Sequence, residues 1–173
     1  MIIVLIGYMA SGKSTIGREL ADKVNYQFVD LDDYIEEREK ISIGDLFKTK
    51  GEIYFRKIET IYLNEIIAEK DHIILSLGGG TPCYGQNMET LQKATNVSSI
   101  YLKASIGALV KRLENEKSQR PLVAHLKSQE DLIEFIGKHL FERTHFYSQA
   151  DHTIITDALT TEDIVKRIRT KLF

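Results

Sequence analysis

Near the start of this chain, a glycine-bounded loop directly follows an apolar run. Residues 2–6 read IIVLI, and residues 7–15 read GYMASGKST. The loop fits the pattern G-x-x-x-x-G-K-[ST], in which glycines let backbone N–H groups wrap closely around phosphate. Residues 11–24 are predicted to form a helix, whose positive N-terminal end would face the same anion. The segment therefore predicts a strand–loop–helix unit that binds a nucleotide.

Two polar side chains of this loop have specific chemical uses. Lys13 would neutralise the β- and γ-phosphate oxygens of a nucleotide, and Ser14 offers a hydroxyl group to Mg²⁺. The alternative interpretation is a chance strand–turn–helix that carries a surface lysine. The complete motif, in its required strand-to-helix context, favours nucleotide binding.

The rest of the chain alternates short apolar segments with segments of helical spacing. Strands are predicted at 2–6, 26–30, 72–77, 97–103 and 151–156. Helices are predicted at 11–24, 31–40, 42–51, 52–70, 86–94, 105–116, 128–149 and 161–172. This alternation is typical of an α/β fold, a parallel sheet with helices on both faces. Ligands of such sheets bind at the carboxyl ends of the strands.

Composition limits the class of protein. A length of 173 residues suggests a single domain, 1–173. The formal net charge is −2, so no general positive field favours nucleic acid or an anionic membrane. No apolar run approaches the ~18 residues of a membrane span. The single cysteine, Cys83, cannot form an internal disulfide, so we expect a reducing, cytoplasmic location. We also expect the protein to be a monomer.

The phosphate loop occurs in several classes of protein. A GTPase would normally carry an N-K-x-D motif that reads the base, and this sequence has none. A motor or transport ATPase would be larger. Small-molecule kinases remain, and four further segments bear on the acceptor of the phosphoryl group.

The first segment is FVDLDD, residues 28–33, at the end of a predicted strand. Asp30 and Asp32 are two residues apart and can face the same way. One carboxylate could act on Mg²⁺, and the other could accept the proton of a hydroxyl group. The alternative is that Asp32 or Asp33 only caps the next helix. The two aspartates alone leave both interpretations open.

The second and third segments are FRKIE, residues 55–59, and GGG, residues 78–80. Arg56 could bind a carboxylate through two parallel hydrogen bonds. It could equally belong to a solvated ion-pair ladder with Glu52 and Glu59. Three consecutive glycines after a strand indicate that a substrate lies close to the backbone, although a tight turn is the alternative.

The fourth pattern consists of two short stretches, RP at residues 120–121 and ERTHFY at residues 142–147, each with one arginine. Arg120 lies in a polar stretch after a predicted helix, which suits a lid that closes over phosphate. Arg143 lies on the predicted helix 128–149. A solvated loop arginine and a surface helix arginine are the alternatives.

Taken together, the ordered motifs GKSTIGRELA, FVDLDDYIE, GEIYFRKIE, LSLGGG, RP and ERTHFYSQA resemble the shikimate kinase family over essentially the whole chain. The resemblance implies a three-layer P-loop kinase fold, a five-stranded parallel sheet flanked by helices. It also implies a substrate-binding helical region at about 32–62 and a lid at about 113–127. The implied activity is ATP-dependent phosphorylation of the 3-hydroxyl of shikimate, a step toward chorismate and aromatic amino acids, with Mg²⁺.

The resemblance also implies residue roles. ATP would be bound by Ala10, Ser11, Gly12, Lys13, Ser14, Thr15, Arg112 and Arg120. Shikimate would be bound by Asp32, Arg56, Glu59, Gly78, Gly79, Gly80 and Arg143. Lys13, Asp32 and Arg120 would be catalytic, and Ser14 and Asp30 would hold Mg²⁺. Arg56 and Arg143 would bind the carboxylate, with Glu59 supporting Arg56.

The chain departs from the family pattern near the nucleotide. Ala10 stands where many members have glycine, the spacing from Arg112 to Arg120 is about one residue long, and residues 156–163 lack an arginine that some relatives place by adenine. Two other functions account for fewer of these residues. A gluconate kinase leaves Asp32, Arg56, Gly79 and Arg143 without a common role. A nucleotide-binding regulatory module leaves the lysine, the aspartates and the lid arginine without a use.

Overall fold

The computed structural model describes residues 1–116, 121–126 and 128–173. Its centre is a five-stranded sheet in the order β2-β3-β1-β4-β5, and every strand pair is parallel. The strands are β1 (Ile2–Ile6), β2 (Gln27–Asp30), β3 (Ile73–Ser76), β4 (Val97–Lys103) and β5 (His152–Ile155). The predicted α/β fold class is confirmed, and all five strands lie where they were predicted.

The central strand β1 explains why the apolar run IIVLI is continuous. All five of its side chains are fully buried. Ile2, Val4 and Ile6 pack into one apolar cluster, whereas Ile3 and Leu5 pack into the other. Alternate residues of a strand point to opposite faces of the sheet, so a strand that is covered on both faces needs an apolar residue at every position.

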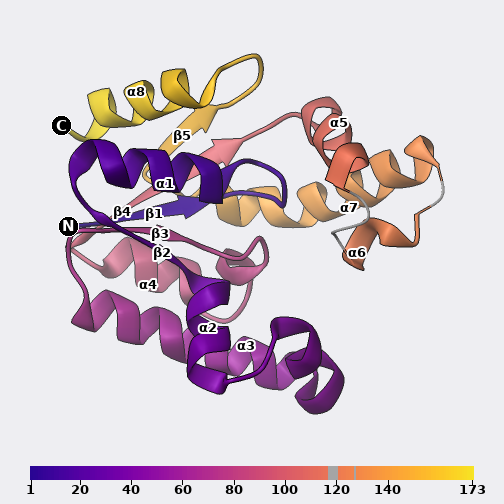
Figure 1. Cartoon of the computed structure of the whole chain (residues 1–173), viewed down its shortest axis with the longest axis horizontal. Coiled ribbons are helices and arrows are strands. Elements are labelled where there is room, and N and C mark those ends of the chain that lie inside the picture. The colour runs from indigo at the N-terminus through magenta and orange to yellow at the C-terminus, as the bar shows by residue number, and fades with distance from the viewer. Residues whose placement is uncertain (117–120, 127) are drawn as a thin grey trace.

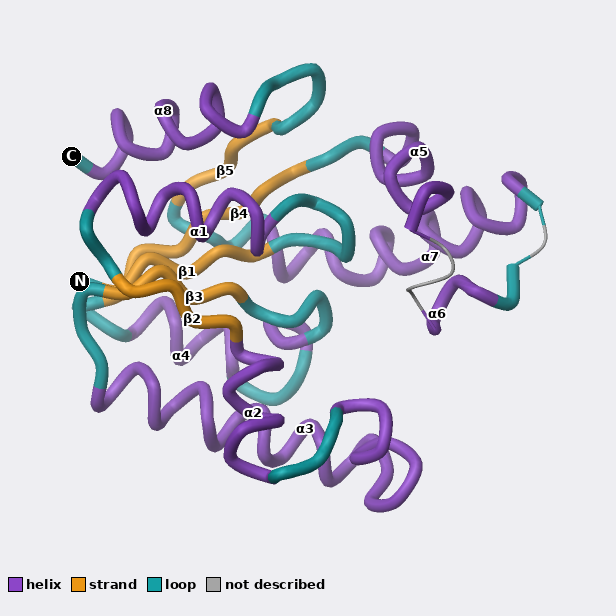
Figure 2. The backbone as a smooth tube through the Cα atoms, viewed as in Figure 1, coloured by secondary structure: helices purple, strands orange, loops and turns teal. Residues whose placement is uncertain are grey.

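Helices cover both faces of the sheet (Figure 1). On one face lie α1 (Lys13–Val24) and α8 (Thr161–Leu172), which pack against each other. On the other face lie α3 (Ile43–Glu69) and α4 (Asn87–Lys93), with α2 (Leu31–Glu39) packed against α3. The tube drawing shows the same three layers (Figure 2).

The long helix α3 contains a break at Gly51, where two helices were predicted to meet. Gly51 has φ = 81°, a left-handed conformation that favours glycine, and α3 continues after it. The residues after the break include Arg56 and Glu59, together with most of the buried residues of α3.

A second group of helices lies beyond the carboxyl ends of the strands (Figure 1). It consists of α5 (Ile106–Glu116), α6 (Pro121–Ala124) and α7 (Gln129–Tyr147). Short α6 and the 3₁₀ turn η1 (Thr81–Cys83) were not predicted, since neither is long enough to show a helical period. Of the expected lid at 113–127, residues 117–120 and 127 lie outside the described residues. Among the helices that the structure describes, none has the length and apolar character needed to cross a membrane.

Candidate active site

The phosphate loop leaves the first turn of α1 without a capping side chain. Gly12 occupies the N-cap position at φ = 95° and makes no side-chain hydrogen bond to the helix. By contrast, α7 and α8 each begin with a complete capping box. The dipole of α1 would attract an anion to this end of the helix, where no side chain caps it.

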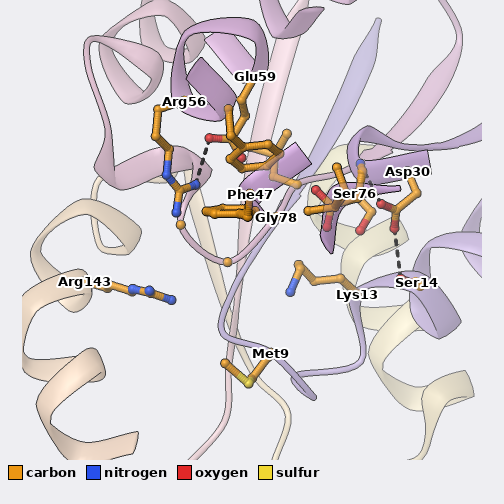
Figure 3. A pocket seen from close by; sticks show the side chains of 16 residues that line it. Met9, Lys13, Ser14, Asp30, Phe47, Arg56, Glu59, Ser76, Gly78 and Arg143 are labelled. Atoms are coloured by element: carbon orange, nitrogen blue, oxygen red, sulfur yellow. Dashed lines mark hydrogen bonds and ion pairs between the residues drawn. The ribbon is translucent and has the colours of Figure 1, made fainter. Parts of the chain in front are cut away.

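Lys13 and Ser14 make different contacts at this helix start. The Lys13 ammonium donates hydrogen bonds to the carbonyl oxygens of Gly7, at 2.9 Å, and Tyr8, at 3.0 Å. The Ser14 hydroxyl donates to Asp30 Oδ2 at 3.1 Å, and Figure 3 shows both side chains on the same side of the pocket. A hydroxyl group and a carboxylate side by side are suitable oxygen ligands for Mg²⁺, which binds few protein groups and keeps several waters.

The helix cap at this strand end is Asp30 and not Asp32 or Asp33. Asp30 Oδ1 accepts a hydrogen bond from the backbone N–H of Asp32 at 3.1 Å, and Asp30 is the N-cap of α2. The cap alternative was therefore wrong about the residue. The side chain of Asp32 instead lines the pocket.

The environment of Asp32 disfavours its charge. Burial is the main cause and the neighbouring carboxylates of Asp30 and Glu59 add to it; together, and against the opposing charge of Lys13, they raise the pKa of this carboxyl to about 6. A carboxyl with a pKa near neutrality is suited to accept a proton from a hydroxyl group.

Arg56 does not belong to a solvated ladder. Its Nη1 donates to Glu59 Oε2 at 3.0 Å, and the Glu59 side chain is only 1% exposed. The second oxygen of that carboxylate accepts a 2.6 Å hydrogen bond from the hydroxyl of buried Thr81. Glu59 thus holds Nη1 of the guanidinium from within the protein. Both ion pairs of the ladder are present, since Arg56 Nε also lies 3.5 Å from Glu52, but of the two glutamates only Glu52 is exposed to solvent.

The glycine triplet gives two arginines room to approach the backbone. A methyl group on Gly80 would lie 2.9 Å from both Nη atoms of Arg56, and one on Gly79 would lie 3.5 Å from Nη1 of Arg143. The carbonyl of Gly79 accepts a 2.5 Å hydrogen bond from the Tyr147 hydroxyl. Arg143 reaches this place from α7, and Figure 3 shows both guanidinium groups directed into the pocket. The surface interpretation of Arg143 is excluded.

These side chains surround a cavity of about 380 Å³. It is lined by Met9, Lys13, Ser14, Asp30, Asp32, Ile43, Phe47, Phe55, Arg56, Glu59, Ser76, Leu77, Gly78, Gly79, Gly80 and Arg143. The lining combines the cations Lys13, Arg56 and Arg143, the carboxylates Asp30, Asp32 and Glu59, and several apolar side chains. Such a cavity fits a small organic acid that also carries hydroxyl groups.

A second cavity, of about 350 Å³, lies on the other side of the phosphate loop. It is lined by Met9, Ala10, Ser11, Gly12, Lys13, Ser14, Thr15, Ile16, Arg112, Leu159, Thr161 and Ile164. Arg112 donates to the carbonyl of Ala10 at 3.0 Å. The two cavities share Met9, Lys13 and Ser14, so a donor in one and an acceptor in the other would meet at the phosphate loop.

Comparison with known protein families decides the assignment. The family model described as shikimate kinase matches residues 9–173. The chain belongs to the shikimate kinase family. It is therefore a P-loop kinase that phosphorylates shikimate with ATP as the phosphoryl donor.

Individual shikimate kinases are similar along the whole chain. The shikimate kinase of Flavobacterium psychrophilum is 49% identical over 171 residues, which are 99% of this chain and 98% of that protein. The crystal structure of shikimate kinase from Bacteroides thetaiotaomicron has a TM-score of 0.90 at 36% identity, covering 99% of this chain and 98% of that one. The Acinetobacter baumannii enzyme, solved in complex with shikimate, has a TM-score of 0.85 at 30% identity, covering 99% and 92%.

Several residues of this shikimate kinase site were not singled out from the sequence. Ile43 and Phe47 form part of the wall of the first cavity, and Leu159 and Thr161 line the second. An apolar residue in a pocket and one in the core have the same chemistry, so periodicity could not distinguish them. Arg120, predicted to bind ATP and to be catalytic, lies outside the described residues.

Proposed function

We propose that shikimate lies in the first cavity with its carboxylate between Arg56 and Arg143 and its 3-hydroxyl next to Asp32. The observation that carries this proposal is that the two guanidinium groups approach consecutive glycines in a cavity that also holds Lys13. Paired guanidinium groups bind a carboxylate with defined geometry. The apolar side chains of the cavity would face the shikimate ring, and Gly78 would lie beside Asp32.

ATP would occupy the second cavity, with its phosphates on the N–H groups at the start of α1. Ala10, Ser11, Gly12, Lys13, Ser14 and Thr15 supply this surface. Arg112 would lie beside the nucleotide, because it already contacts the loop through Ala10. Arg120 keeps its predicted role at the transferred phosphoryl group.

The chemistry follows from these placements. Asp32 accepts the proton of the 3-hydroxyl as the oxygen attacks the γ-phosphorus, and ADP leaves. Lys13 neutralises charge on the phosphoryl group, and positioning supplies much of the rate. We propose that the divalent metal is Mg²⁺, held by Ser14 and Asp30, whose hydroxyl and carboxylate oxygens lie 3.1 Å apart. When bound, Mg²⁺ neutralises phosphate charge.

We further propose that the chain is a single domain and a cytoplasmic monomer, with the substrate-binding region at about 32–62. Residues 32–62 supply Asp32, Arg56 and Glu59 from α2 and α3, which pack against each other. The single cysteine and the use of ATP support the cytoplasm. Light scattering in solution tests the monomer, and a mass near twice 19.8 kDa would contradict it.

A coupled assay of ADP release tests the proposed function. The assay is run with shikimate, with gluconate and with no acceptor, each with Mg²⁺ and with a chelator. We expect rapid release with shikimate and Mg²⁺ only. Turnover with gluconate alone would overturn the acceptor assignment, and unchanged turnover after chelation would overturn the metal assignment.

A further inference from the structure

Tyr84 follows the turn η1 and lies directly against Arg56. The Arg56 Cζ atom stands 3.9 Å from the centre of the Tyr84 ring, a cation–π contact. The Tyr84 hydroxyl donates to Glu52 Oε1 at 3.1 Å. The same oxygen, Glu52 Oε1, lies 3.5 Å from Arg56 Nε. Tyr84 therefore acts on Arg56 twice, through its ring and through a shared carboxylate.

The other contacts of Arg56 leave one degree of freedom for Tyr84 to restrict. The bond to Glu59 fixes Nη1 at one edge of the guanidinium. The absence of a side chain on Gly80 gives the group room, and 19% of the Arg56 side chain is exposed. The contacts with Glu59 and Glu52 are made through Nη1 and Nε and still permit rotation of the guanidinium plane, and the Phe55 ring lies farther away, 5.2 Å from Cζ. A ring stacked on the face of the guanidinium opposes this rotation.

The segment 80–84 supplies three of these constraints. Gly80 makes room, Thr81 bonds to Glu59, and Tyr84 stacks on the guanidinium. The turn η1 joins them, since the N–H of Tyr84 is directed at the carbonyl of Thr81. The glycine triplet and the residues after it thus form one support for the arginine.

We propose that Tyr84 is a positioning residue that holds the guanidinium plane of Arg56 in the orientation that binds the substrate carboxylate. This inference rests on the proposed role of Arg56. Because Arg56 would contact a carboxylate that does not react, its orientation affects the ground state and the transition state equally. The loss of Tyr84 would therefore raise the KM for shikimate and leave kcat unchanged.

Steady-state kinetics of Tyr84→Leu and Tyr84→Phe test the proposal. Leu removes the aromatic face and is expected to raise the KM for shikimate roughly fivefold, with kcat and the KM for ATP unchanged. Phe keeps the face and loses only the bond to Glu52, which is 55% exposed, so its KM should stay within about twofold of the parent. Tyr84 is 37% exposed, and thermal melting of both variants should match the parent.

Two further variants separate the possible failures. Tyr26→Leu makes the same change at a ring that packs on His72, and it should leave the KM for shikimate unchanged. Arg56→Lys reports on the carboxylate site itself. If Arg56→Lys raises this KM but Tyr84→Leu does not, the positioning role of Tyr84 is wrong and the carboxylate site stands. If Tyr84→Phe is as impaired as Tyr84→Leu, the stacked ring is not the cause. If Arg56→Lys leaves the KM for shikimate unchanged, Arg56 does not bind the carboxylate and the proposed function is wrong.

Discussion

Arg56 and Arg143 are far apart in the sequence, and their guanidinium groups approach consecutive glycines, Gly80 and Gly79. The first arginine comes from α3 and the second from α7. Two cations would repel each other without an anion between them, and Glu59 offsets only the charge of Arg56. The two guanidinium groups are therefore suited to bind an organic anion.

The first prediction concerns the shape of the Arg56 head group. Arg56→Lys keeps the charge but loses the planar pair of donors, so one hydrogen bond to the carboxylate is lost. We expect the KM for shikimate to rise by roughly tenfold, with the KM for ATP unchanged, in steady-state assays. Arg38→Lys is the matched control. The Arg38 side chain is 48% exposed and pairs with Glu65, so this substitution should leave both KM values unchanged. Near-parent kcat/KM in Arg56→Lys would instead place Arg56 outside the site.

The second prediction concerns the space beside Gly80. A methyl group there would lie 2.9 Å from the Arg56 guanidinium, so Gly80→Ala must displace that group. We expect the KM for shikimate to increase at least about fivefold, while the KM for ATP holds. Gly107→Ala serves as the control because no atom lies within 4 Å of its added methyl group. If the two variants have the same KM for shikimate, Arg56 moves aside without loss of substrate binding.

The third prediction concerns the pH dependence of the reaction. The pKa of Asp32 is about 6, chiefly because of burial and then because of Asp30 and Glu59. A general base must be deprotonated, so kcat/KM for shikimate should fall tenfold per pH unit below about pH 6. Asp32→Asn should lose about 10²-fold or more in kcat and show no such limb. A pH profile that is flat from pH 5 to 8 would rule Asp32 out as the base.

The fourth prediction concerns stability. The folded state raises the pKa of Asp32 above its value of 3.8 in an unfolded chain, so between about pH 4 and pH 6 the folded state binds more protons. The contribution of Asp32 to stability is therefore lost as pH rises through this range. Asp32→Asn should exceed the parent in stability by about 3 kcal/mol at pH 7 and by nothing below pH 4. Melting curves at both pH values check this, and a destabilised variant at pH 7 would contradict it.

The fifth prediction concerns Ala10. This residue holds φ = 60°, a left-handed conformation in which a Cβ atom is strained. Ala10→Gly relieves the strain but adds freedom to the unfolded chain, so a net gain of about 0.5 kcal/mol is expected. Denaturant unfolding measures it, with the KM for ATP as the functional readout. A loss of stability would mean that the loop tolerates the alanine without strain.

The sheet could be predicted from the sequence because strands leave a pattern in consecutive residues. The fully buried strand β1 needs an unbroken apolar run, and the phosphate loop needs its glycines, so both leave a pattern in consecutive residues. The roles of Asp32 and Arg56 remained open for the opposite reason. Glu59 is 1% exposed and accepts a hydrogen bond from Thr81, which is 22 residues away. Such contacts follow from packing and not from spacing.

Other parts of the site left no readable pattern. Phe47 lines the cavity, but it sits on α3 with the same helical spacing as core residues. Tyr84 lies in a segment of no regular period, next to a turn of three residues. Only the folded chain brings these rings to the cavity wall and to Arg56, respectively.

The position of the substrate carboxylate can be measured in the structure of a complex with ADP and shikimate. The account predicts that the shikimate carboxylate lies about 3 Å from nitrogens of both Arg56 and Arg143, with a ring hydroxyl at similar distance from Asp32. A carboxylate bound elsewhere, with the two guanidinium groups separated by water, would contradict it.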